Sequence, residues 1–243
     1  MDIFTSVYEL SRKGIFIMCF SPSASFTAAV LLGTLGYACL KETKNPKEGL
    51  LASIPLFFAV QQAAEGVVWM TIPGSETTIS LATLLQTPLL TASTHVFLFF
   101  AYLFWPLWIP LSFLAVEKVQ FRTKILATTL IAGMIFGGAS LGYLFYTGGL
   151  IDLAIKGHSL HYELFKTLPQ LLCDIFKLLY LYAVLAPSLV SSMKRAWIFG
   201  LLIAATFALS EYLYTVAFVS VWCFFSAIAS ASIYVILRQR QTN

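Results

Sequence analysis

Charge is the scarcest property of this 243-residue chain, because only 11% of its residues are Asp, Glu, Lys or Arg. Soluble domains average about 25% charged residues. Hydrophobic residues make up 59% of the chain, which is more apolar surface than a soluble core of this size can bury. An ordinary cytosolic enzyme and a disordered chain are therefore excluded. The net charge of +4 indicates no basic patch, so no nucleic-acid partner is expected either. What remains is a polytopic membrane protein whose first partner is the lipid bilayer.

Cysteine is also scarce, and the four cysteines show no metal-type spacing. Cys19, Cys173 and Cys223 map to the predicted outer half of the protein. An oxidising exterior permits a disulfide there, and Cys19 with Cys223 is the candidate pair. Buried free thiols are the alternative. The chain also lacks the phosphate-binding Gly-Lys-Ser/Thr loop and the Gly-x-Gly-x-x-Gly of dinucleotide-binding enzymes.

Seven stretches are apolar and long enough to cross a bilayer, which takes about 20 helical residues. They are Pro22–Leu40, Leu50–Met70, Thr94–Val116, Ile125–Tyr146, Thr167–Pro187, Ala196–Tyr214 and Ala217–Leu237. The last two are almost contiguous, which predicts a tight hairpin. The segment Ile79–Thr91 is apolar but short and broken by Pro88, so it predicts a re-entrant or interfacial segment.

The predicted fold is therefore an all-α integral membrane protein, a bundle of about seven transmembrane helices in one domain. Residues 18–237 form the membrane domain, residues 1–17 an N-terminal extension and residues 238–243 a basic cytoplasmic tail. Met18 is an alternative first residue, because the seven spans remain intact without the extension.

Basic residues predict the orientation, since Lys and Arg are enriched in cytoplasmic loops. Ten of the 15 basic residues lie on one side of the predicted spans: Lys41, Lys44, Lys47, Lys118, Arg122, Lys124, Lys194, Arg195, Arg238 and Arg240. The N-terminus is thus predicted outside and the C-terminus in the cytoplasm, in a multipass protein of the inner (cell) membrane.

Ionisable side chains inside spans are costly, and they usually face a bundle interior or a water-filled cavity. The polar groups of four spans map to a similar outer depth: Gln61, Glu65, His95, Asp174, Lys177 and Glu211. We expect them to form an outward-facing pocket for a small polar or cationic ligand or an ion, in binding, sensing or proton-coupled transport. Glu65 and Glu211 would be the charge or proton groups, and Lys177 the counter-ion of Asp174. In the alternative, structural reading, Asp174 or Glu211 pairs with Lys177 only to hold helices together, in a membrane partner without a ligand.

A metal-dependent intramembrane hydrolase acting on a lipid is the competing enzyme hypothesis. Its ligands would come from His95, His158, His161 and Asp174, which have ligand types that zinc accepts. No cofactor is expected under the leading hypothesis, which leans away from an enzyme.

Two small-residue motifs in the fourth span, Gly133-x-x-x-Gly137 and Gly138-x-x-x-Gly142, permit close approach of another helix. Packing within the bundle and homo-oligomerisation through this span both fit the motifs.

Short segments across nearly the whole chain from Met18 carry a family resemblance. They are Met18–Phe26 (MCFSPSASF), Gln61–Trp69 (QQAAEGVVW), Phe104–Pro110 (FWPLWIP) and Ser220–Phe225 (SVWCFF). The chain resembles a family of small, functionally uncharacterised prokaryotic multipass membrane proteins with these motifs. The resemblance implies a shared multipass fold and draws attention to Cys19, Glu65, Trp222 and Cys223, but it attaches no reaction to them.

Overall fold

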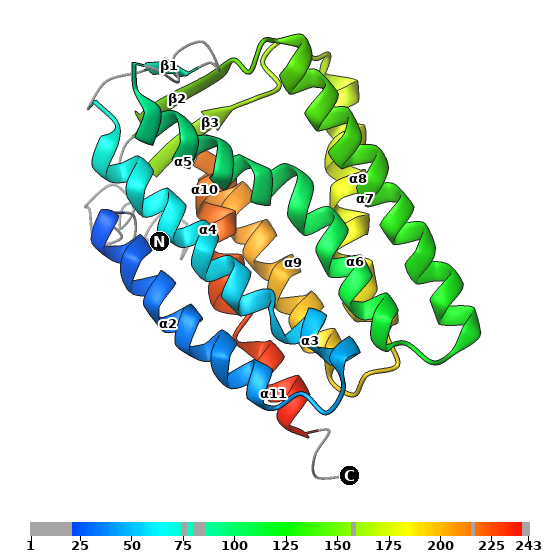
Figure 1. The fold of residues 1–243 in the computed structure, drawn as a ribbon. Helices are drawn as coiled ribbons and strands as arrows, with labels where there is room; N and C mark the ends of the chain where they lie inside the picture. Colours follow the sequence, from blue (N-terminus) through cyan, green and yellow to red (C-terminus); the bar gives the residue numbers. More distant parts are fainter. Residues whose placement is uncertain (1–20, 74–76, 80–85, 157–158, 215–216, 240–243) are drawn as a thin grey trace, which may run out of the picture.

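The computed structural model describes residues 21–73, 77–79, 86–156, 159–214 and 217–239. Within these residues seven helices are long and apolar enough to cross a membrane, as the sequence predicts. In chain order the spans are α2 (Pro22–Lys41), α3 with α4 (Pro46–Ala52, Ile54–Thr71), α5 with η2 and α6 (Pro88–Phe99, Phe100–Phe104, Trp105–Val116), α7 (Gln120–Tyr146), α8 (Gln170–Val190), α9 (Ala196–Leu213) and α10 with α11 (Phe218–Ala229, Ser232–Gln239) (Figure 1).

Helix starts follow from local sequence. Ser21 caps α2, since its hydroxyl accepts a hydrogen bond from the backbone N–H of Ala24 at 3.2 Å, and Pro22 takes the first helical position. Asn45 caps α3 in the same way through Glu48 N–H, whose carboxylate in turn accepts from the backbone N–H of Lys44. The second span therefore begins before Leu50, where hydropathy alone places its start.

The third span corrects one prediction. It begins at Pro88, six residues before the predicted Thr94, so the last part of the supposed re-entrant segment Ile79–Thr91 is transmembrane helix. Pro88 starts this helix instead of breaking one, because proline lacks only an N–H that the first turn leaves unpaired anyway. Ile79 ends a strand, and residues 80–85 lie outside the described ranges.

A small antiparallel sheet also corrects the all-α prediction. Strands β1 (Thr77–Ile79), β2 (Ile151–Lys156) and β3 (Ser159–Glu163) pair in the order β1-β2-β3, with Thr78 opposite Asp152. Ile151, Leu153 and Leu160 are buried against the bundle, and the ring of Tyr162 stacks on Phe97 with centroids 4.8 Å apart. Gly148 and Gly149 have positive φ values, which turn the chain from α7 into the sheet.

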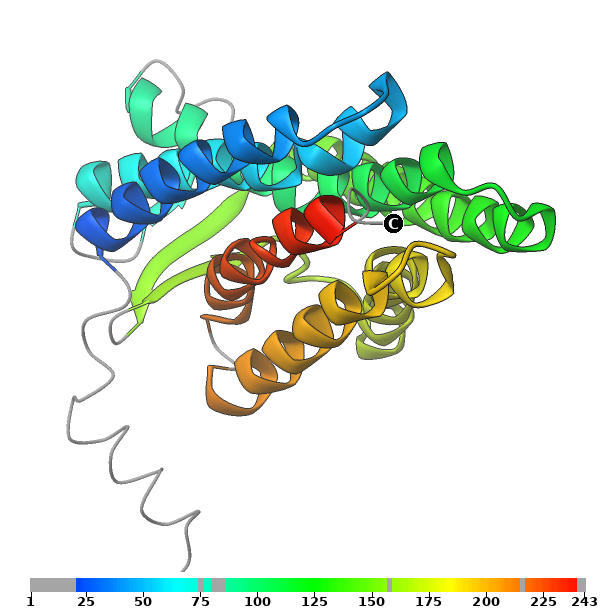
Figure 2. The same ribbon diagram turned by 90° about the horizontal axis from the view of Figure 1, so that it is seen from below.

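The sheet lies at one end of the bundle, and the connections α2–α3, α6–α7 and α8–α9 lie at the other end together with the C-terminal helix α11 (Figure 1). Most basic residues are therefore on the end opposite the sheet, hereafter the basic end. The membrane orientation stays a prediction, in which the sheet end faces outside. Figure 2 shows the molecule from the basic end, with α8–α11 lying against the layer that contains α2, α4 and α7.

Glycine brings backbones into contact in the bundle interior. A Cβ built on Gly133 would clash with the carbonyl oxygen of Pro106, so α7 touches the third span directly. Gly137 meets Leu103 of the same span, whereas Gly138 and Gly142 have no neighbour within 4 Å. The first Gly-x-x-x-Gly motif therefore packs within the bundle. Homo-oligomerisation through the second motif stays a prediction.

Candidate functional site

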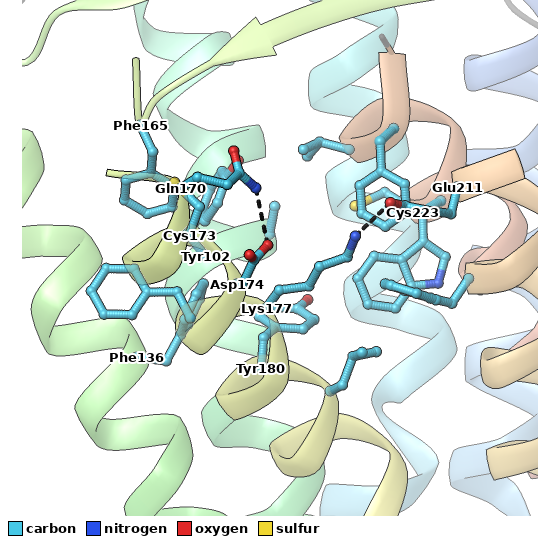
Figure 3. A pocket seen from close by; sticks show the side chains of 17 residues that line it. Tyr102, Phe136, Phe165, Gln170, Cys173, Asp174, Lys177, Tyr180, Glu211 and Cys223 are labelled. Atoms are coloured by element: carbon cyan, nitrogen blue, oxygen red, sulfur yellow. Dashed lines mark hydrogen bonds and ion pairs between the residues drawn. The ribbon is translucent and has the colours of Figure 1, made fainter. Parts of the chain in front are cut away.

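A cavity of about 310 Å³ lies between η2, α7, α8, α9 and α10, in the half of the bundle near the sheet. We call it the α8–α9 pocket (Figure 3). Six of its lining residues carry polar or thiol groups: Gln170, Cys173, Asp174, Lys177, Glu211 and Cys223. Aromatic rings form much of the remaining wall: Tyr102, Phe136, Phe165, Phe176, Tyr180, Phe207, Phe218 and Trp222.

The charges of the pocket come from the first turns of α8 and the last turn of α9. Lys177 Nζ lies 2.5 Å from Glu211 Oε1, and both side chains are about two-fifths exposed. Asp174 accepts a hydrogen bond from Gln170 Nε2 at 3.0 Å (Figure 3). Lys177 therefore pairs with Glu211, and the expected Asp174–Lys177 pair is not the one formed. The two carboxylates and one ammonium carry a formal charge of −1.

The ammonium of Lys177 also lies against aromatic faces. Its Nζ is 5.4 Å from the ring centroid of Phe207 and 5.8 Å from that of Phe218, within the range of cation–π attraction. Trp222 packs on both rings, at centroid distances of 5.1 and 5.3 Å. The pocket thus combines a net negative charge with rings that already face a cation.

Glu65 lies apart from this pocket. Its side chain is 2% exposed, and it accepts hydrogen bonds from Ser220 Oγ at 2.5 Å and Gln62 Nε2 at 3.3 Å. Neighbouring Gln61 is fully buried and accepts from Trp105 Nε1 at 2.7 Å. We call Gln61, Gln62, Glu65 and Ser220 the Glu65 cluster. The structure therefore divides the predicted site in two, because α4 is buried in the bundle while α8 and α9 leave space between them.

Among the described residues, three polar atoms of or near the Glu65 cluster are buried without a hydrogen-bond partner: Gln61 Nε2, Gln62 Oε1 and Tyr162 OH. Tyr162, on β3, lies near both Glu65 and Cys223. Burial raises the pKa of this phenol well above its ordinary value, and the nearby carboxylate of Glu65 adds to the effect. The hydroxyl of Tyr162 is therefore a neutral group that faces the cluster.

The histidines are not brought together by the described part of the chain. His95 Nδ1 lies 2.7 Å from the carbonyl oxygen of Thr91, and the ring lines a separate cavity of about 80 Å³ against α7. His161 Nε2 is 3.8 Å from a carboxylate oxygen of Glu163 on the same strand, and His158 lies outside the described residues. Among the residues described, no three His, Cys, Asp or Glu side chains form a group suited to a metal ion.

The candidate disulfide stays a prediction. Cys223 is buried and lines the α8–α9 pocket together with Cys173, while Cys19 lies outside the described residues.

A family of unknown function, DUF6629, matches residues 18–243. The chain belongs to this family. No curated protein and no solved structure matches the DUF6629 chain. The family description attaches no activity, so the function has to be argued from the residues themselves.

One serine of this DUF6629 chain has the spacing of a hydrolase motif. The segment Gly138–Gly142 reads Gly-Ala-Ser-Leu-Gly, which matches the Gly-x-Ser-x-Gly pattern of a nucleophile elbow. Such an elbow is a turn from a strand into a helix, whereas Ser140 lies inside α7 and donates its hydroxyl to the carbonyl oxygen of Phe136 at 2.8 Å. The motif therefore presents no nucleophile here.

Sequence reasoning missed several residues of both sites in the DUF6629 chain. Ser220 and Trp105 hold the polar side chains of α4, and eight aromatic residues line the α8–α9 pocket. The family resemblance does include Ser220, Trp105, Trp222 and Cys223. Aromatic residues are common in apolar spans, so nothing in their spacing marks those that meet in one cavity.

Proposed function

We propose that the α8–α9 pocket binds a small organic cation and that the protein recognises this ligand at a cell membrane. The observation that carries the proposal is the combination of a net negative charge with aromatic faces in one cavity. Recognition of this kind serves a sensor or a proton-coupled transporter. If the sheet end faces outside, as the basic residues predict, the ligand enters from the exterior.

Asp174 is the group we assign to the ligand's charge. Lys177 and Glu211 pair with each other at 2.5 Å, whereas among the described residues Asp174 receives a hydrogen bond only from the neutral amide of Gln170. Its carboxyl group therefore has no cationic partner in the described part of the pocket. A bound cation supplies the missing counter-charge.

The aromatic rings select for an organic cation. Quaternary and alkylated ammonium groups carry a positive charge on an apolar surface, and aromatic cages bind them through the ring faces. The ammonium of Lys177 beside Phe207 and Phe218 is an internal example of the same contact. The cavity volume of about 310 Å³ is at the small end of ligand pockets, which favours a small ligand.

Calorimetry with tetramethylammonium tests the proposal, with the uncharged alcohol 2,2-dimethylpropanol as a comparison of similar shape. Tetramethylammonium should bind to the detergent-purified protein with a measurable affinity that the alcohol lacks. Asp174→Asn should weaken this binding about fivefold, since loss of a partially exposed ionic contact is worth about 1 kcal/mol. The matched control is Glu163→Gln, which removes a carboxylate from β3 outside the pocket.

The proposal fails if the wild type binds the cation and the alcohol equally well, or binds neither. It also fails if Asp174→Asn and Glu163→Gln have the same effect.

A further inference from the structure

The Glu65 cluster contains a buried carboxylate without a cationic partner in the described part of the chain. Ser220 and Gln62 donate to Glu65, and both donors are neutral. Placing a charge inside a membrane span is costly, so such a group needs either a counter-charge or a bound proton.

The elements packed against α4 bring two titratable neighbours to Glu65. They are Cys223 from α10 and Tyr162 from β3, a thiol and a phenol, and neither can supply a positive charge. Residues 22–36 of α2 contain no titratable side chain. On α5, the ring of His95 lines the separate cavity against α7. No described Lys or Arg faces the carboxylate, so a proton is the simplest cation that satisfies it.

Gln62 equips the cluster for both protonation states of Glu65. Its Nε2 donates to the carboxylate, while its Oε1 is buried and has no hydrogen-bond partner among the described residues. Rotation of the amide about its last bond exchanges these two atoms. The donor side suits an ionised carboxylate, and the acceptor side suits the O–H of a protonated acid.

Helix α10 connects this cluster with the α8–α9 pocket. Ser220 contacts Glu65 on one side of the helix, whereas Phe218, Trp222 and Cys223 line the pocket. A change in the strength of the Ser220–Glu65 hydrogen bond therefore acts on the first turns of α10, which also form part of the pocket wall.

We propose that Glu65 is a proton-binding site and that its proton and the organic cation in the pocket exclude each other through α10. The second half of this proposal rests on the proposed function. When the carboxyl binds a proton, it becomes a weaker acceptor for Ser220, Gln62 turns its Oε1 toward the acid, and the negative charge near the pocket is lost. Each change weakens cation binding. By linkage, cation binding displaces the proton.

Calorimetry of tetramethylammonium binding in phosphate and in Tris buffer tests the exclusion, because the two buffers differ in their heat of protonation. The wild type should release a proton on binding and should bind about fivefold or more weakly at pH 5.5 than at pH 8. Glu65→Gln should bind at the weak level at both pH values and release no proton. Ser220→Ala keeps the carboxyl but removes its contact with α10, so it should reduce the pH dependence. The exclusion is overturned if Glu65→Gln releases protons as the wild type does.

A measurement without ligand separates this proposal from the proposed function. Infrared difference spectra between pH 5.5 and pH 8 should show a carboxylic acid C=O band in the wild type and in Asp174→Asn that is absent from Glu65→Gln. If the wild type binds no tetramethylammonium at any pH, the proposed function and the exclusion both fail, and the infrared band alone decides the proton site. If Glu65→Gln retains the band, Glu65 is not the proton site. A band whose titration shifts when Na⁺ replaces K⁺ would overturn the proton assignment in favour of a metal cation.

Discussion

The two ends of the α2–α4 pair show how differently the halves of this bundle are built. Near the basic end, a Cβ on Gly36 would lie 2.7 Å from the backbone nitrogen of Leu56. Near the sheet end, a Cβ on Gly66 would lie 2.9 Å from the ring of Phe26, which is a mobile side chain. The sheet-side half also holds the Glu65 cluster and the charges of the α8–α9 pocket. The half near the basic end is thus tightly packed, whereas the half near the sheet contains the polar groups and the α8–α9 pocket.

The largest expected effect tests whether the half near the basic end is more tightly packed than the half near the sheet. Gly36→Ala forces two backbones apart, so we expect a loss of about 3 kcal/mol in the free energy of unfolding, at the upper end for overpacked cores. Gly66→Ala should cost about 1 kcal/mol, because the ring of Phe26 can turn aside. Unfolding in mixed detergent micelles measures both values.

Gly142→Ala is the control for this pair, since nothing lies within 4 Å of its Cβ position. It should be neutral or stabilising, because alanine favours a helix over glycine. Equal losses for Gly36→Ala and Gly66→Ala would contradict the difference between the halves.

An intermediate effect concerns two tryptophans one turn apart. Trp105→Phe leaves the buried Oε1 of Gln61 without its donor, at a cost of about 2 kcal/mol. Trp108→Phe should cost about 1 kcal/mol, because the carbonyl oxygen of Leu50 keeps a hydrogen bond from Ser53 Oγ at 2.8 Å. Thermal unfolding followed by fluorescence ranks the two variants. The reverse ranking would mean that the polar groups of α4 are satisfied by water.

The smallest expected effect is at the basic end and depends on pH. Burial by itself raises the pKa of Glu117, but hydrogen bonds from Ser192, Val119 and Lys118 outweigh it and lower the pKa from 4.5 to about 2. Because the folded-state pKa is depressed, this stability is fully present above pH 4.5 and is lost as pH falls toward 2. Glu117→Gln should therefore cost about 1 kcal/mol at neutral pH, after allowance for solvent screening.

The melting temperatures of Glu117→Gln and the wild type should converge as the pH is lowered from 4.5 toward 2. Asp152→Asn removes a carboxylate with a lowered pKa at the sheet end, as Glu117→Gln does at the basic end. The salt-bridging hydrogen bond from Lys166 chiefly lowers the pKa of Asp152, and the hydrogen bond from Thr78 contributes. If the difference in melting temperature between Glu117→Gln and the wild type stayed constant with pH, the carboxylate of Glu117 would not be the stabilising form.

Some features of this protein depend only on the local sequence, and others depend on which helices are neighbours in the fold. The number of spans depends on hydropathy along one dimension, so seven helices long and apolar enough to cross a membrane could be predicted. Which polar groups of different helices meet depends on which helices are neighbours. That arrangement separated Glu65 from the pocket and paired Lys177 with Glu211.

The sheet could have been predicted in part. Ile151 and Leu153 are buried on either side of the half-buried Asp152, which is the start of a strand alternation, and Gly148 with Gly149 precedes them as a turn signal. Its partner β1 is three residues long, and strands this short carry no usable periodicity. The pairing of β1 with β2 across 70 residues of chain requires the fold.

The sheet and Glu117 each join two of the connections between spans, at opposite ends of the bundle. At one end, β1 and β2 bind the connection between the second and third spans to the one between the fourth and fifth. At the other end, Glu117 binds the connection between the third and fourth spans to Ser192, between the fifth and sixth. Neither pair of joined connections includes the hairpin of α9 and α10, which carries Glu211 and Trp222 in the wall of the α8–α9 pocket. Helix α10 packs instead on β3, α2 and α4, so packing against these elements fixes this wall of the pocket.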